Sequence, residues 1–188
     1  MKTHRLWIAA LVVLSVGYAV PGFTEETCAP LLNFSARTLD GKETVDFCKS
    51  YRKQVVLVVN TASQCGYTGQ LKGLEALYQA YRGQGLVVLG FPSNDFRQEQ
   101  GSASDTERVA RKEYGTTFPL FERSAVSGTE ASPFFKELAK ASGVTPAWNF
   151  QKYLIGRNGK IIKVYPSNVA PDDPLFRIEL EAALAEKP

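Results

Sequence analysis

Histidine is nearly missing from this sequence, because its 188 residues include only one, His4. His4 lies in an N-terminal segment that we expect to be removed from the mature protein. A chain without histidine cannot form Cys–His or Ser–His–Asp nucleophile systems, and it cannot form histidine metal sites. These function classes are therefore excluded for the mature chain, and we predict neither a metal nor an organic cofactor.

An apolar run long enough to cross a bilayer is also missing. Residues 6–16 are apolar, but this run is shorter than the roughly 20 residues that a membrane-spanning helix needs. Lys2 and Arg5 precede the run, and the small-residue stretch 17–19 follows it, which is the layout of a secretory signal peptide. We predict that residues 1–19 are cleaved and that the protein is exported to the periplasm or the cell exterior, without stable membrane insertion. An uncleaved N-terminal anchor is the alternative.

The chain carries no strong excess of either charge. Removal of Lys2 and Arg5 with the leader lowers the formal net charge from +3 to +1. Nucleic-acid binding depends on clustered positive charge, so no nucleic-acid partner is predicted. The hydrophobic content of 44% is ordinary for a globular protein, and we expect a single domain over residues 28–188.

Cysteine is scarce as well, with only Cys28, Cys48 and Cys65 in the chain. An exported protein meets an oxidising compartment, where an odd number of cysteines leaves at least one thiol unpaired. Cys28 and Cys48 lie near the mature N-terminus, and we expect them to form a structural disulfide. Three free thiols are the alternative.

Apolar patterns in the first half of the domain predict a hairpin and a strand–helix–strand unit. The hairpin covers residues 33–47 and turns at Asp40–Gly41. Continuous apolar runs at 54–62 and 85–91 are typical of strands that are buried on both faces. Thr68 is the expected N-cap of the helix between them. This order predicts two parallel strands joined by a helix.

Three further helices and a second hairpin are predicted after residue 100. Their signals are a Ser104/Glu107 capping box for a helix reaching about Tyr114, a Ser132–Pro133 start with a Gly143 stop, an Asn158–Gly159 turn within residues 153–165, and an Asp173–Pro174 start. With the first half, this order predicts a thioredoxin-like α/β fold. Such a fold has a central mixed sheet with helices on both faces, here with an added N-terminal hairpin.

Cys65 is expected at the junction between a buried strand and the start of a helix. Unpaired backbone N–H groups and the helix dipole would favour the thiolate there, which is the reactive form of cysteine. No second cysteine follows at the C-x-x-C spacing, so an ordinary dithiol oxidoreductase is disfavoured. A small buried cysteine that fills a gap in the core is the structural alternative.

Four segments resemble, in order, the signature sequences of the glutathione peroxidases. They are NTASQCGYT (60–68), GFPSNDFRQEQG (90–101), FPLFERSAVSG (118–128) and WNFQKYLIGRNG (148–159). The resemblance covers about residues 32–185 and implies a bacterial-like member of the cysteine type, which the predicted leader makes an exported one. It implies a thiol-dependent peroxidase that reduces hydrogen peroxide and organic or lipid hydroperoxides through a sulfenic acid on Cys65.

The resemblance also implies a catalytic group made of Cys65, Gln98, Trp148 and Asn149. Gln98 and Trp148 supply neutral N–H donors that can stabilise a thiolate, and Asn149 can both donate and accept, which suits a proton relay. Gln100 is the alternative to Gln98, because this loop is one residue shorter than the family pattern. The plain alternatives are a core aromatic for Trp148, a turn residue for Asn149 and a solvated loop residue for Gln98.

The sequence departs from the family pattern at Asp95 and Ala110. Asp95 adds a carboxylate near the site that would oppose a thiolate if it pointed inward. Ala110 stands where many cysteine-type members have a resolving cysteine. We therefore expect an external thiol, glutathione or a thioredoxin-like protein, to complete the cycle, with Cys28 or Cys48 as the alternative. The absence of a long insertion before residue 148 implies a monomer.

Two other functions compete with the peroxidase. One is a thiol–disulfide oxidoreductase that uses Cys65 together with Cys28 or Cys48. The other is a non-catalytic binding module with a thioredoxin fold, in which Cys65 has no chemical role.

Overall fold

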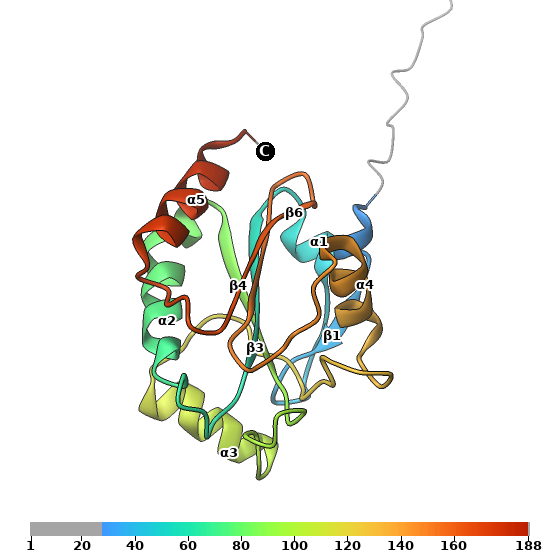
Figure 1. Cartoon of the computed structure of the whole chain (residues 1–188), viewed down its shortest axis with the longest axis vertical. Coiled ribbons are helices and arrows are strands. Elements are labelled where there is room, and N and C mark those ends of the chain that lie inside the picture. The colour runs from blue at the N-terminus through green and yellow to red at the C-terminus, as the bar shows by residue number, and fades with distance from the viewer. Residues whose placement is uncertain (1–27, 188) are drawn as a thin grey trace, which may run out of the picture.

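A four-stranded sheet lies at the centre of the computed structural model, which describes residues 28–187 (Figure 1). In spatial order its strands are β4 (Leu86–Pro92), β3 (Val55–Thr61), β5 (Lys152–Ile155) and β6 (Ile161–Tyr165). β3 and β4 are parallel, whereas β5 is antiparallel to both β3 and β6. The predicted mixed sheet and its parallel strand pair are confirmed. The predicted signal peptide, residues 1–19, lies outside the described residues.

Helices cover both faces of the sheet (Figure 1). They are α2 (Gln70–Tyr81) and α5 (Pro174–Ala185) on one face, and α1 (Phe47–Tyr51) and α4 (Pro133–Ser142) on the other. All seven residues of β3 are buried, because alternate side chains enter the two opposite cores. Leu71, Leu74 and Leu77, which recur at helical spacing, form the buried face of α2. None of the helices between residues 28 and 187 has both the length and the apolar character needed to cross a bilayer.

The N-terminal hairpin forms as predicted. Its strands are β1 (Ser35–Arg37) and β2 (Thr44–Asp46), and they pair antiparallel. Short 3-10 helices lie before the hairpin and after α2, η1 (Pro30–Leu32) and η2 (Arg82–Gln84). Cys28 and Cys48 form a disulfide with a Cα–Cα distance of 5.9 Å, which confirms the predicted pairing. The disulfide ties the start of the domain to α1.

Helix ends in the second half follow the predicted signals at α4 and α5. Ser132 and Asp173 accept backbone N–H groups at the two starts, each followed by a proline in the first turn. Gly143 ends α4 in the left-handed conformation, with φ of 72°. The β5–β6 hairpin turns through Asn158–Gly159 as predicted.

The helix that precedes α4 in the chain begins at a different residue from the one predicted. This helix is α3 (Ala103–Glu107), and it continues as a π-helix, η3 (Arg108–Glu113). Ser102 caps α3 and exchanges hydrogen bonds with Asp105, so the predicted Ser104/Glu107 capping box is wrong. Both pairs have the same spacing of a serine and an acid. Gly101 decides between them, because its φ of 98° turns the chain into the helix directly before Ser102.

Candidate active site

Cys65 lies in the turn of residues 62–68 between β3 and α2, which we call the nucleophile turn. The Thr68 hydroxyl closes this turn, because it accepts the backbone N–H of Cys65 at 3.0 Å and donates to the carbonyl of Ala62 at 2.8 Å. The predicted helix cap at Thr68 is therefore wrong. α2 begins at Gln70, and Gly69 precedes it in a conformation that is already helical and needs no side-chain cap.

The Cys65 sulfur is nearly enclosed, since the residue is 8% exposed. Among the described residues, its one hydrogen bond comes from the backbone N–H of Tyr67, with 3.4 Å between N and Sγ. This donor belongs to the segment that leads into α2, where the sequence predicted unpaired N–H groups. The thiol is free, whereas the other two cysteines are bonded to each other.

The loop after β4 brings Gln98 against the nucleophile turn. The Gln98 backbone carbonyl accepts the N–H of Gln64, the residue before the cysteine, at 3.0 Å. The Gln98 side-chain carbonyl accepts from Asn149 Nδ2 at 2.9 Å. Gln100 is exposed, and its amide instead donates to a carbonyl within its own loop. Of the two glutamines, it is Gln98 that the structure brings to the other predicted site residues.

The turn before β5 presents Trp148 and Asn149 at the same end of the sheet. Asn60, near the end of β3, holds this turn by donating to the Trp148 carbonyl at 3.0 Å. Asn60 also accepts the N–H of Phe150 at 2.6 Å. Phe150 has φ of 64°, a conformation that bulky residues rarely adopt and that these contacts stabilise.

Asn149 and Trp148 differ sharply in exposure. Asn149 is fully buried, and its Oδ1 has no hydrogen-bond partner in the part of the chain that the structure describes. Buried polar atoms without a partner are rare and often belong to functional sites. Trp148 is 41% exposed and packs on Phe96, with 5.3 Å between the ring centroids. This exposure argues against a core role for Trp148.

The predicted donors form no hydrogen bond with the sulfur in the part of the chain that the structure describes. Within residues 28–187, neither Gln98 nor Trp148 forms a hydrogen bond with Cys65 Sγ, so the structure gathers these side chains around the nucleophile turn without closing them on it. Catalytic hydrogen bonds are often long before a substrate binds and shorten when it does.

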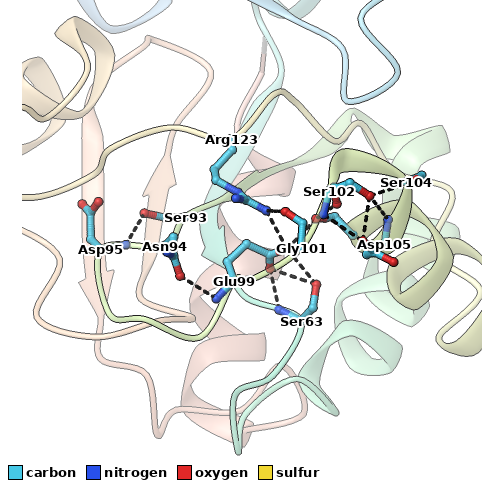
Figure 2. A network of polar contacts seen from close by, with 11 residues as sticks. Ser63, Ser93, Asn94, Asp95, Glu99, Gly101, Ser102, Ser104, Asp105 and Arg123 are labelled. Carbon is cyan, nitrogen blue, oxygen red and sulfur yellow. Dashed lines mark hydrogen bonds and ion pairs between the residues drawn. The ribbon is translucent and has the colours of Figure 1, made fainter.

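Asp95 points away from the nucleophile turn (Figure 2). Its Oδ2 accepts the backbone N–H groups of Val126 and Ser127 at 2.7 and 2.8 Å, and the Ser127 hydroxyl at 3.0 Å. The Asp95 carboxylate is hydrogen-bonded to the neighbouring loop at residues 126–127. It does not point toward Cys65, so the orientation that would oppose a thiolate is not present.

Sequence reasoning missed three buried polar residues beside the site, namely Asn60, Glu99 and Lys152. Lys152 is fully buried in β5, and its Nζ donates to the Phe150 carbonyl at 2.7 Å. Burial lowers the pKa of Lys152 from 10.5 to about 7. A lysine at the start of the apolar stretch 152–155 is a signal that could have found Lys152.

Comparison with known proteins decides the family. A family model described as glutathione peroxidase matches residues 31–139, more than half of the chain. The hydroperoxy fatty acid reductase gpx1 of Synechocystis is 41% identical over 160 residues, which cover 79% of this chain and 94% of that protein. The chain belongs to the glutathione peroxidase family.

The peroxidase is thus an oxidoreductase that reduces hydroperoxides with electrons from thiols. Its structure is similar to the crystal structure of apo Trgpx, with a TM-score of 0.67 and 34% identity over 86% of this chain and 98% of the other. A thiol:disulfide interchange protein of the thioredoxin family from Chlorobium tepidum gives a TM-score of 0.63 at 16% identity, covering 85% of this chain and 98% of that one. The latter likeness shows the fold alone, and it confirms the predicted thioredoxin-like fold.

The disulfide of the peroxidase lies on the far side of the sheet from Cys65. Cys65 packs in the core beneath α2 and α5, whereas Cys28 packs against the core beneath α1 and α4. Cys48 is part of α1. This placement argues against either cysteine acting as the resolving partner of Cys65. No group of metal-binding side chains occurs among the described residues.

Proposed function

We propose that this protein is an exported, cysteine-type peroxidase whose only reactive thiol, Cys65, is regenerated by an external thiol such as glutathione. The observation that carries the proposal is the arrangement of the three cysteines. Cys65 is free in the turn that the Gln98 loop contacts, whereas the other two cysteines are paired on the opposite face of the sheet.

In the first half-reaction the Cys65 thiolate attacks the distal oxygen of the hydroperoxide. An S–O bond forms while the O–O bond breaks, so two electrons pass from sulfur to oxygen and Cys65 becomes a sulfenic acid. The proton that left the thiol goes to the departing alkoxide or hydroxide, which leaves as an alcohol or as water.

Neutral side chains assist this step. Gln98 and Trp148 direct N–H donors at the charge on sulfur and at the leaving oxygen. Asn149 relays the proton, since its amide donates through Nδ2 and its buried Oδ1 is available as an acceptor.

In the second half-reaction an external thiol attacks the sulfenic sulfur. An S–S bond forms and the hydroxyl group leaves as water. A second thiol then attacks the mixed disulfide, which releases a disulfide of the two external thiols and the Cys65 thiolate. No second cysteine of the chain is needed, which agrees with Ala110 at the position where the family pattern often has a resolving cysteine.

Organic hydroperoxides, including those of fatty acids, are the substrate class we propose. The Trp148 and Phe96 rings form an apolar surface beside the site, and Trp148 is 41% exposed. The Synechocystis relative is named a hydroperoxy fatty acid reductase. The predicted leader and the disulfide favour an oxidising compartment, the periplasm or the cell exterior, and we expect a monomer.

Peroxide consumption by the mature protein tests the proposal. Wild type, Cys65→Ser and the Cys28→Ser/Cys48→Ser double variant are each given hydrogen peroxide or a fatty-acid hydroperoxide with glutathione or reduced thioredoxin. We expect activity in wild type and the double variant and none in Cys65→Ser. Equal rates in wild type and Cys65→Ser would remove the peroxidase mechanism.

Mass spectrometry identifies the resolving thiol. After one equivalent of peroxide, Cys65 should carry a sulfenic acid, and added glutathione should convert it to a mixed disulfide. A disulfide between Cys65 and Cys28 or Cys48 would instead favour the thiol–disulfide oxidoreductase.

A further inference from the structure

Glu99 is a buried carboxylate with an unusually complete set of partners (Figure 2). The residue is 0% exposed. Its Oε2 accepts the backbone N–H of Ser63, and both oxygens lie 2.9 Å from the Ser63 hydroxyl. Its Oε1 accepts the Thr106 hydroxyl and lies 3.8 Å from Nη2 of Arg123. An ionised carboxylate is tolerated in a protein interior only when donors and an opposite charge surround it in this way.

These contacts join the two loops that form the active site. Ser63 belongs to the nucleophile turn two residues before Cys65, and Glu99 directly follows Gln98. The two loops are also joined by a backbone hydrogen bond, in which the N–H of Gln64 donates to the carbonyl of Gln98 at 3.0 Å. Two adjacent residues of one loop therefore hold two adjacent residues of the other.

The same carboxylate is anchored to a third segment and to its own loop. Thr106 lies on α3, so the hydroxyl bond ties the Gln98 loop to that helix. Arg123 also donates to the carbonyl of Gly101 at 2.9 Å, at the far end of the loop. The Glu99 backbone N–H donates to Asn94 Oδ1 at 3.1 Å, which folds the loop on itself.

We propose that Glu99 is a positioning residue for peroxide reduction, fixing the separation between Cys65 and the Gln98 amide without touching the substrate itself. The inference rests on the proposed function of Cys65 and Gln98. A carboxylate is the group that suits this place, because its two oxygens accept the Ser63 N–H and the Thr106 O–H at once, while its charge pairs with Arg123. A glutamine can keep one oxygen contact and presents an NH₂ group on the other side.

Glu99→Gln is the informative variant, with Glu122→Gln as the matched control, because Glu122 is an exposed glutamate that pairs with Arg37. The rate constant of Cys65 with peroxide is measured by stopped flow. The rate of Cys65 alkylation by iodoacetamide is measured on the same samples at a pH high enough to ionise Cys65 in every protein, because alkylation then no longer depends on stabilisation of the thiolate by Gln98. We expect Glu99→Gln to slow peroxide reduction by about 10- to 100-fold, since small displacements of catalytic groups have effects of that size. Alkylation should change by less than about threefold, and Glu122→Gln should match wild type in both assays.

A double-mutant cycle separates positioning from general loss of structure. If Glu99 acts through Gln98, the double variant Gln98→Ala/Glu99→Gln should reduce peroxide less than about twofold more slowly than Gln98→Ala alone. Multiplicative losses, equal slowing of both Cys65 reactions, or an unchanged peroxide rate in Glu99→Gln would each overturn the proposal. If Glu99→Gln does not fold, Thr106→Val removes one donor to the carboxylate and is judged by the same outcomes. An inactive wild-type enzyme would instead refute the proposed function.

Discussion

Replacement of Lys152 by methionine is expected to remove a pH-dependent penalty on folding. Lys152 is fully buried, and burial lowers its pKa from 10.5 to about 7 because the charged ammonium loses its hydration. Between these two pH values the unfolded chain binds a proton that the folded protein does not. Stability therefore rises with pH through this window, whereas below about pH 7 both states are protonated and the penalty is constant.

The magnitude follows from the two pKa values. One pKa unit corresponds to about 1.4 kcal/mol, so the full penalty below pH 7 is about 5 kcal/mol. A single group that titrates at about 7 when folded and at 10.5 when unfolded changes the free energy of unfolding by about 2 kcal/mol between pH 7 and pH 9. Methionine fills a similar volume and does not titrate, so the variant lacks this increase.

Urea unfolding of wild type and Lys152→Met at pH 7 and pH 9 measures the effect. The variant also loses the hydrogen bond to the Phe150 carbonyl, but that loss shifts its stability at both pH values alike. The decisive quantity is therefore the change with pH in the difference between the two proteins. Lys136→Met, which replaces an exposed lysine on α4, should show no such change. A difference between wild type and Lys152→Met that stays constant from pH 7 to pH 9 would refute the reasoning.

Four further outcomes are expected. Trp148→Phe should slow peroxide reduction about tenfold in stopped flow while the melting temperature stays nearly unchanged, because the replaced side chain is 41% exposed. Asn149→Ala should slow the same reaction by about 10- to 100-fold, because the Gln98 side-chain carbonyl loses its donor. Asp173→Ala should lower stability by about 1 kcal/mol in urea unfolding without changing peroxide turnover, because it removes the N-cap of α5. The Cys28→Ser/Cys48→Ser variant should lose about 3 kcal/mol, the loop-entropy value for a bridge across a sequence separation of 20, and should keep its peroxidase activity.

The fold could be predicted from the sequence wherever local signals and burial agree. Residues 55–59 are apolar throughout, and the matching strand β3 is buried on both faces because helices cover both sides of the sheet. Ser132 and Asp173 were predicted correctly as helix starts because the helix-opening pattern occurs only once near each of them. Ser102 was missed because two serine–acid pairs overlap there and only the backbone of Gly101 decides between them.

The polar supports of the site could not be predicted in the same way. Thr68 has the position of a helix cap, but its hydroxyl is used to close the nucleophile turn, which is a contact that only the folded chain defines. Glu99 stands in a polar loop where a solvated side chain is the usual expectation, yet contacts from Ser63 and Arg123 make it a buried charge. Such partners lie far apart in the sequence and meet only through the tertiary fold.

The direction of the strands explains why these distant segments meet. β3 and β4 are parallel and paired up to Thr61 and Pro92. The turn after β3 and the loop after β4 therefore begin at the same end of the sheet, the carboxyl end of these two strands. β5 is antiparallel to β3, and its first residue, Lys152, pairs with Val59. The segment that leads into β5 therefore lies at that same end of the sheet. The nucleophile turn, the Gln98 loop and the Trp148–Asn149 turn are therefore brought together by strand polarity. A parallel β5 would place Trp148 and Asn149 at the opposite end of the sheet, so the proposed active site requires the antiparallel arrangement of β5.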